Sequence, residues 1–242
     1  MDKKKLSWLM LAVAALLLLG SGIGSTRAAL TFYSDNYVAE ITVSQIGVSL
    51  LENGEVVSSR DYVEDKWKVF TNRGESSASG ALLKNMLGEG EKVAFNKPYK
   101  ERLTVKNSGT IDTYVRARVY RYWTKGKTKL TTLSPSLIDL NFVNEDKWLK
   151  NPNETAECTE LFYKDILPAG TETLPFVDSV RIDGAIAAEA KVERKGNVIT
   201  TTYKYDGVEF HVDVEVDAVQ THNAQDAIKS AWGVDASALG IL

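Results

Sequence analysis

The residues of this chain best suited to metal binding or catalysis are two histidines, one cysteine and a row of carboxylates. His211 and His222 are 11 positions apart, and Glu209 and Asp213 lie on the same alternating segment as His211. Two histidines and a carboxylate can bind zinc, but the His-Glu-x-x-His motif of zinc peptidases is absent. His211, Glu209 and Asp213 are therefore the candidate metal ligands, although we expect neither a resident metal nor a cofactor.

The acidic row around His211 has two other interpretations. Its carboxylate oxygens suit calcium, yet the sequence has no Asp-x-Asp-x-Asp-Gly loop. A solvated strand face, or pairing with Arg116 and Arg118 on a neighbouring strand, explains the row without an ion, and we favour it. The row consists of Glu209, Asp213, Glu215 and Asp217.

Nucleophilic catalysis has no positive signal in this sequence. Cys158 has no evident histidine partner, and residues 29–242 contain neither a Gly-x-Ser-x-Gly elbow nor a phosphate-binding glycine loop. A single cysteine excludes an internal disulfide, so we expect its thiol to pack as a small apolar group. The sequence predicts that the protein is not an enzyme.

The N-terminus has the three-part pattern of a secretory signal peptide. Three lysines at positions 3–5 precede an apolar run over 6–19 and a stretch of small residues that ends at Ala28. Thr26 and Ala28 supply the small side chains at −3 and −1, which predicts cleavage between Ala28 and Ala29 by signal peptidase. An uncleaved anchor is the alternative, weakened by three glycines at its end. We expect a secreted protein that meets the membrane only through residues 1–28, before cleavage.

Composition predicts one folded domain over residues 29–242. Residues 1–28 hold four of the 29 Lys and Arg residues and one of the 32 Asp and Glu residues, which leaves a net charge of −6 on the rest. A chain this acidic is a poor ligand for nucleic acid or anionic lipid. The hydrophobic content of 44% argues against disorder.

Alternating apolar residues and turn signals predict many short strands. Asn53-Gly54 predicts a hairpin from residue 45 to 57, because both central positions of a type I′ turn need positive φ. Leu103–Lys106 and Thr113–Trp123 are predicted as adjacent strands, and residues 161–163 and 177–182 as another pair. A second hairpin is predicted between Val198–Tyr205 and Val208–Asp217, across Asp206-Gly207.

Other segments interrupt this pattern. The polar stretch Ser58–Gly80 predicts a long excursion off the sheet, and Ala81–Leu87 a short helix. Apolar residues at helical spacing over 224–232 predict a C-terminal helix that begins at Thr221 or Asn223 and stops at Gly233. The predicted fold is all-β: an antiparallel, jelly-roll-like sandwich with one short C-terminal helix and a long early insertion.

The order of three motifs resembles the TasA/camelysin family over nearly the whole chain. These motifs are Ala29–Asp35, then Leu103–Asp112 with Tyr114-Val115-Arg116, and finally His222–Gly233. The resemblance is closest to the branch of biofilm matrix proteins whose signal peptide is cut by the peptidase SipW in spore-forming Gram-positive bacteria. It implies a secreted jelly-roll subunit that assembles into extracellular matrix fibres, with itself or with related matrix proteins.

The resemblance also implies donor-strand exchange, in which the N-terminal strand of one subunit fills a vacancy in the next. The expected assembly strand contains Leu30, Thr31, Phe32 and Tyr33, of which Leu30 and Phe32 would enter the neighbour's core. In the alternative, Ala29–Asp35 is the domain's own edge strand. Two other functions remain open: a carbohydrate-binding or adhesive sandwich that uses Tyr120 and Tyr122, and a camelysin-like metallopeptidase.

Overall fold

The computed structural model describes residues 45–63, 66–72, 80–188, 190–195, 198–203 and 205–242. All of them belong to the second of two units of the chain, residues 44–242. The predicted signal peptide, the cleavage position at Ala28 and Ala29 and the predicted assembly strand lie outside the described residues. Within the described ranges, no helix is both long and apolar enough to cross a membrane.

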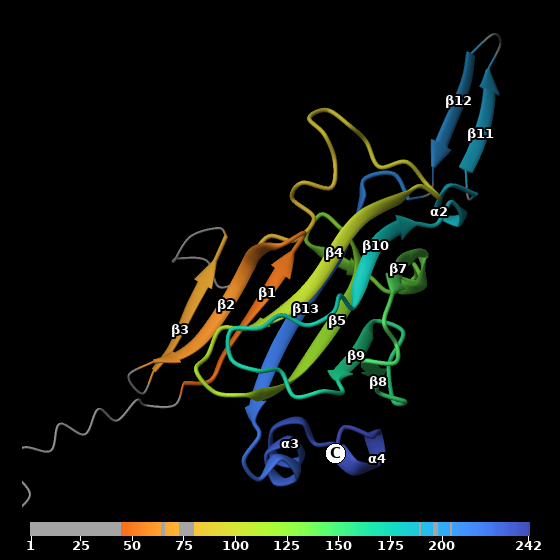
Figure 1. Ribbon diagram of the computed structural model, residues 1–242. Coiled ribbons are helices and arrows are strands. Elements are labelled where there is room, and N and C mark those ends of the chain that lie inside the picture. The colour runs from red at the N-terminus through yellow and green to blue at the C-terminus, as the bar shows by residue number, and fades with distance from the viewer. Residues whose placement is uncertain (1–44, 64–65, 73–79, 189, 196–197, 204) are drawn as a thin grey trace, which may run out of the picture. The chain divides into compact units, whose positions relative to one another are not determined.

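Two antiparallel sheets face each other and enclose the core (Figure 1). In spatial order, the six-stranded sheet contains β3 (Lys66–Thr71), β2 (Glu55–Val63), β1 (Gly47–Glu52), β4 (Pro98–Asn107), β10 (Val177–Ile182) and β7 (Ile138–Phe142). The five-stranded sheet contains β13 (Val208–Gln220), β5 (Thr113–Lys125), β9 (Cys158–Tyr163) and β8 (Trp148–Lys150), with β6 (Thr128–Leu130) beside β5. The predicted all-β sandwich is confirmed.

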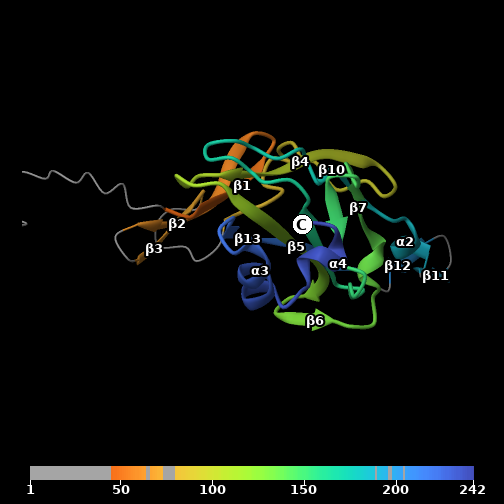
Figure 2. The same ribbon diagram turned by 60° about the horizontal axis from the view of Figure 1, so that its bottom comes forward.

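Other elements are short. A separate two-stranded sheet pairs β11 (Ala190–Lys195) with β12 (Val198–Tyr203). The helices are the 3-10 turn η1 (Pro135–Leu137), α2 (Ala185–Ala188), α3 (Ala224–Trp232) and α4 (Ala236–Leu239). Figure 2 shows that α3 and α4 lie together at one end of the sandwich.

Alternation along β5 explains why the two sheets pack. Val115, Ala117 and Val119 are fully buried between the sheets, whereas Arg116 and Tyr120 belong to the outer face. The opposite sheet supplies a matching apolar face through β1 and β4. Because strand side chains alternate with a period of two, one sequence pattern provides both the core and a charged exterior.

The hairpin predicted at Asn53-Gly54 is confirmed. It joins β1 to β2, and Asn53 and Gly54 have φ values of 52° and 88°, as a type I′ turn requires. The prediction that residues 58–80 leave the sheet is wrong for 58–63 and 66–71, which form the rest of β2 and all of β3. In Figures 1 and 2 these strands extend past β13, the terminal strand of the opposite sheet. The opposite sheet does not cover them there, so a polar sequence is compatible with a strand.

The prediction of a helix over 81–87 is also wrong. The segment consists of turns, and Leu83 has a φ of 59°, outside the helical region. Its apolar side chains pack against the core instead of forming a helix face. They are Leu82, Leu83, Met86 and Leu87, all partly buried.

The pairing of β13 differs from the prediction. The segment Val208–Asp217 does not form a hairpin with Val198–Tyr205, because β13 pairs with β5 along all of its length and β12 pairs with β11. The turn before β13 is present, and the Val208 amide donates to the Tyr205 carbonyl over 3.2 Å. We attribute the pairing of β13 with β5 to their side chains. In the register of the two strands, apolar residues lie beside apolar residues, and carboxylates of β13 lie beside arginines of β5.

The two other predicted pairs are split between the sheets. β4 and β5 follow one another in sequence but lie in opposite sheets, and so do β9 and β10. Asn107 holds the corner between β4 and β5, because its Nδ2 donates to the Ile111 and Leu167 carbonyls over 2.8 and 2.9 Å. A turn that joins strands of opposite sheets uses the same residue types as a hairpin turn, so the sequence pattern did not distinguish the two kinds of turn.

The C-terminal helix is confirmed as α3. Asn223 is its N-cap residue but forms no capping hydrogen bond through its side chain, and Gly233 ends the helix at φ 72°. Ile228 is fully buried, and Trp232 packs 5.7 Å from Phe162 of β9, measured between ring centroids. This second apolar cluster fixes α3 to the outer face of the five-stranded sheet.

Replacing Ile228 with alanine should therefore leave a cavity under α3. We expect Ile228→Ala to lower the free energy of unfolding by about 2–5 kcal/mol. Urea unfolding measures this change, with Lys229→Ala as the control because Lys229 is exposed on the same helix. Equal midpoints for the two variants would contradict the packing of α3 on the sheet.

Candidate functional site

The free edge of β13 is the feature that dominates one side of the sandwich. β13 is 13 residues long and is the terminal strand of its sheet. Among the strands that the structure describes, only β5 pairs with it. A terminal strand exposes backbone N–H and C=O groups that can pair with another strand. The edge of β13 is therefore a ready template for strand addition.

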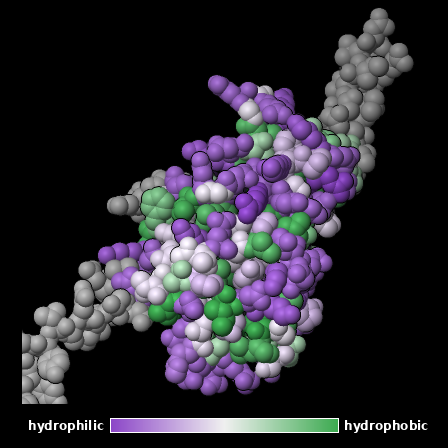
Figure 3. All heavy atoms as spheres, viewed as in Figure 1, coloured by the Kyte–Doolittle hydropathy of each residue, from purple (hydrophilic) through white to green (hydrophobic). Residues whose placement is uncertain are grey.

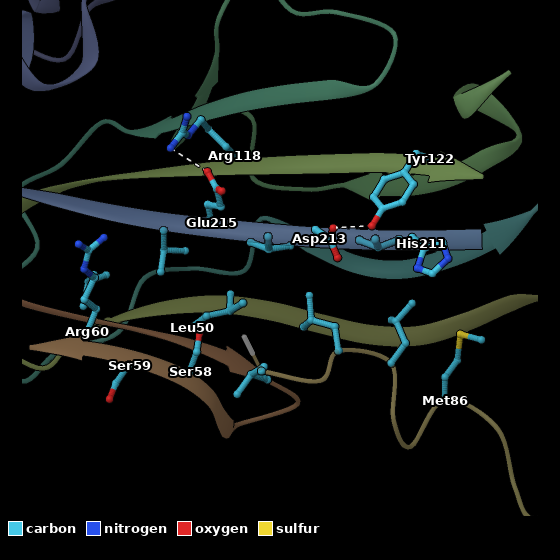
Figure 4. Close-up of a pocket in the computed structure, with 18 of the residues that line it drawn as sticks. Leu50, Ser58, Ser59, Arg60, Met86, Arg118, Tyr122, His211, Asp213 and Glu215 are labelled. Atoms are coloured by element: carbon cyan, nitrogen blue, oxygen red, sulfur yellow. Dashed lines mark hydrogen bonds and ion pairs between the residues drawn. The ribbon is translucent and has the colours of Figure 1, made fainter. Parts of the chain in front are cut away.

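A groove of about 980 Å³ runs along this edge, between β13 and the strands β1 and β2 (Figure 4). The residues that line it include both faces of β13: Val212, Val214 and Val216 from the inner face, and Asp213 and Glu215 from the outer face. A groove that contacts both faces of one strand surrounds the edge of that strand. Its position is where a sixth strand would extend the five-stranded sheet.

The wall of the groove opposite β13 has an apolar part toward the sandwich interior, beside the polar residues Ser58, Ser59 and Arg60. Leu50 and Val57 are almost fully buried in the core and also line the groove. Val69 of β3 lines it as well and is about half exposed. On the face shown in Figure 3, apolar patches likewise interrupt a mostly polar surface. Apolar side chains of an added strand would be covered by this wall.

The candidate metal ligands take part in contacts between strands. The His211 ring stacks on Tyr122 with a centroid separation of 4.9 Å, and its Nε2 lies 2.8 Å from Oγ1 of Thr124. Asp213 accepts a hydrogen bond of 2.8 Å from the Tyr122 hydroxyl. Glu209 lies on the same face, opposite Thr124 in the register. Within the described ranges, no three His, Cys, Asp or Glu side chains come together as a metal site.

The remaining candidates are separated from this cluster. His222 is exposed beyond the end of β13, immediately before α3. Cys158 is a free cysteine on β9, and burial raises the pKa of its thiol, which disfavours the reactive thiolate. The Tyr120 hydroxyl is 3.5 Å from Glu215, so both tyrosines of the suggested adhesive face contact side chains of β13.

The predicted pairing with Arg116 and Arg118 is confirmed for Glu215 and Asp217 of the acidic row, whereas Asp213 contacts Tyr122. Arg118 donates from Nη2 to Glu215 over 2.7 Å. Arg116 donates to Asp217 over 2.7 Å and to Glu160 over 2.8 Å. Its guanidinium carbon also lies 5.3 Å from the centroid of the Trp232 ring. One buried arginine thus joins β5, β9, β13 and α3.

These two arginines should differ in their contribution to stability. The side chain of Arg116 is 9% exposed and that of Arg118 is 33% exposed. Arg116→Ala removes the nearest cation from two partly buried carboxylates, of which Asp217 keeps Arg118 at 3.5 Å and Glu160 keeps Asn151, and we expect a loss of about 3 kcal/mol in the free energy of unfolding. Arg118→Ala should cost about 1 kcal/mol or less, because its partner is exposed. Similar losses in chemical denaturation would contradict this assignment.

A pair of buried carboxyl groups lies at one end of β1 and β4, and sequence analysis did not identify it. Glu101 is 2% exposed and Glu52 is 9% exposed. Burial raises the pKa of both side chains, and the charge of Glu101 raises the pKa of Glu52 further. Asn53 donates to Glu101 over 2.8 Å, and the Leu83 amide donates to Glu52 over 2.6 Å. The sequence signal that could have revealed this pair was a glutamate at an inward-facing position of β1 and another at an inward-facing position of β4.

The raised pKa of Glu101 predicts a pH-dependent stability. Its contribution to folding is fully present below the unfolded pKa, about 4.3, and is lost as the pH rises through the higher folded pKa. Glu101→Gln removes this loss, so the variant should match the wild type near pH 4 and exceed its urea midpoint at pH 7. Glu209→Gln, at an exposed position, is the control. A constant difference across this range would contradict the assignment.

Comparisons with protein-family models, curated proteins and solved structures each found no match to this chain. The groove along β13 is therefore the candidate functional site on geometric grounds. It combines a strand edge that no other described strand occupies, a partly apolar wall and an open volume large enough for a polypeptide segment.

Proposed function

We propose that this protein is a secreted, non-enzymatic structural subunit of extracellular biofilm matrix fibres. Each subunit inserts its N-terminal strand into the groove along β13 of the next subunit. The observation that carries the proposal is the groove itself, where the free edge of a long terminal strand faces an apolar wall. The sequence resemblance to the TasA/camelysin family, with its jelly-roll subunits, points to the same function.

Strand addition would use two kinds of contact. Backbone hydrogen bonds with the edge of β13 would provide affinity for any extended segment. Alternate side chains of the added strand would then point into the sandwich, toward Val214 and Leu50. In the segment Ala29–Asp35, Leu30 and Phe32 alternate with Thr31 and Tyr33, so one face of that strand is apolar.

The arrangement would produce a filament and not a closed dimer. The donor strand and the acceptor groove are different surfaces, so each subunit carries one free donor and one free acceptor. Contacts of this heterologous type continue indefinitely unless the rotation between subunits happens to close a ring. Cleavage after Ala28 would release the donor, because a strand tethered to the membrane cannot enter a neighbour's groove.

The first test compares purified protein that begins at Ala29 with protein that begins at Tyr37, by electron microscopy. We expect filaments only from the longer form. Phe32→Lys should abolish filaments because it places a charge against the apolar part of the groove wall, whereas Thr31→Lys should retain them because that side chain faces outward, on the same face as Asp213 and Glu215. Residues 31 and 32 are matched neighbours, so this pair tests the direction of the side chains.

Two results would contradict the proposal. Filaments from the form that begins at Tyr37 would show that the N-terminal strand is not the donor. Monomers from every form, across pH and protein concentration, would exclude self-assembly. Binding of a monomer to polysaccharide in the second case would favour the adhesive alternative.

A further inference from the structure

A second hollow, of about 640 Å³, lies on the outer face of the six-stranded sheet. Residues of β1, β2, β3 and β4 and of the turn after β4 line it. In β1, the core residues Val48 and Leu50 flank Ser49, so Ser49 belongs to the face turned away from the core. We call this space the outer hollow. The lining residues used below are Ser49, Ser59, Asp61, Phe70, Lys106 and Ser108.

The floor and two walls of the outer hollow form one row across four neighbouring strands. β4, β1, β2 and β3 lie side by side in this order (Figure 1). Their register places Lys106 opposite Ser49, Ser49 opposite Ser59, and Ser59 opposite Phe70. Residues opposite one another share a face, and adjacent strands are about 4.8 Å apart. Two small serines therefore lie between a long lysine and a large aromatic ring, which leaves a depression over the serines.

Phe70 offers an aromatic surface beside this depression. Its side chain is 50% exposed, although phenylalanine is a residue type that is usually buried. The aromatic residues that the sequence suggested for an adhesive face, Tyr120 and Tyr122, contact carboxylates of β13 instead. The ring of Phe70 is thus available to stack on a flat apolar surface of a ligand.

The polar groups of the outer hollow are available for hydrogen bonds. Within the part of the chain that the structure describes, the hydroxyls of Ser49 and Ser59 form no hydrogen bond and Lys106 forms no ion pair. A hydroxyl can donate and accept, an ammonium group donates, and a carboxylate such as that of Asp61 accepts. Donors and acceptors therefore alternate over a short distance beside the aromatic ring.

The carboxylate of Asp61 is held in place at one end of the outer hollow. In the register, Asp61 lies opposite Gly47, and a Cβ atom added to Gly47 would come within 2.5 Å of Oδ1 of Asp61. The missing side chain of Gly47 lets the carboxylate lie over β1, where it accepts a hydrogen bond from the Ser108 hydroxyl. A side chain held in this way is already positioned before a ligand binds.

This set of groups fits a saccharide better than a peptide. A pyranose ring has an apolar face of C–H groups, which can stack on a phenylalanine ring, and hydroxyls around its rim, which can donate and accept. A peptide that adds as a strand needs an unpaired strand edge, whereas β1 and β2 are each paired on both sides. One lysine and one aspartate also balance in charge, which favours a neutral ligand over an acidic one.

We propose that the outer hollow binds a neutral polysaccharide, with a pyranose ring stacked on Phe70. Sugar hydroxyls form hydrogen bonds with Ser49, Ser59, Asp61 and Lys106. The volume lies within the range of about 300–1,000 Å³ that is usual for small-ligand sites. This inference goes beyond the proposed function and does not depend on strand insertion, because the edge of β13 belongs to the other sheet.

Binding of protein that begins at Ala29 to immobilised dextran, mannan and galactan tests the proposal, with alginate as the acidic counterpart. We expect binding to at least one neutral polysaccharide, weaker binding to alginate, and about a fivefold to tenfold loss of affinity in Phe70→Ala. Phe70→Trp should retain binding because it keeps an aromatic ring. Phe95→Ala is the matched control, because Phe95 is 49% exposed and lies outside the outer hollow.

A second variant tests the polar side of the outer hollow. Lys106→Met keeps most of the length of the side chain but removes its hydrogen-bond donors, so it should weaken binding to the same polysaccharide. Its urea midpoint and that of Phe70→Ala should equal the wild-type value within error, since both side chains lie on the outer face. Unchanged affinity in both variants would overturn the assignment of the site.

Other outcomes separate this proposal from the proposed function. Binding to none of the three neutral polysaccharides, or tighter binding to alginate than to each of them, would overturn it. Loss of filaments in Phe70→Ala without any polysaccharide binding would overturn it too and would assign the outer hollow to a contact between subunits. Phe32→Lys should bind polysaccharide as the wild type does, so a failure of strand insertion alone would leave the saccharide site standing.

Discussion

The backbone of β13 must satisfy hydrogen-bonding groups along two edges, and β5 accounts for one of them. Most features of this side of the molecule follow from that constraint. The valines of β13 face the core, its carboxylates contact arginines and tyrosines of β5, and its second edge borders a groove. An edge of this length is a liability in a soluble protein unless something covers it.

The contacts of β13 divide into a fixed side and an adaptable side. Arg116 joins β13 and β9 to β5 through partly buried ion pairs and contacts the Trp232 ring of α3, so side-chain contacts hold the five-stranded sheet together on that side. On the groove side, β1 and β2 supply an apolar wall without pairing to β13. A strand that is held on one side and borders an open groove on the other is well suited to accept another strand, because little reorganisation is needed on binding.

Local patterns predicted the elements better than their partners. Alternation identified β5 and β13, the Asn53-Gly54 turn identified the first hairpin, and helical spacing identified α3, because these signals depend on neighbours in sequence. The choice of partner depends on distant residues. The prediction that β12 pairs with β13 was therefore wrong, and the turn after Asn107 joins strands of opposite sheets instead of the strands of a hairpin. The groove had no sequence signal, since the sequence of a strand at the end of a sheet, as β13 is among the described strands, has the same alternation as that of any other strand.

Hydrogen exchange along β13, before and after filaments form, tests the central claim most directly. Half of its amides point away from β5. They should exchange rapidly in the dilute monomer and become protected on assembly, because only hydrogen-bonded amides resist exchange. The amides that point to β5 should be protected in both samples. Outward amides that exchange as rapidly in filaments as in the monomer would contradict the account, because no strand would then occupy the edge of β13.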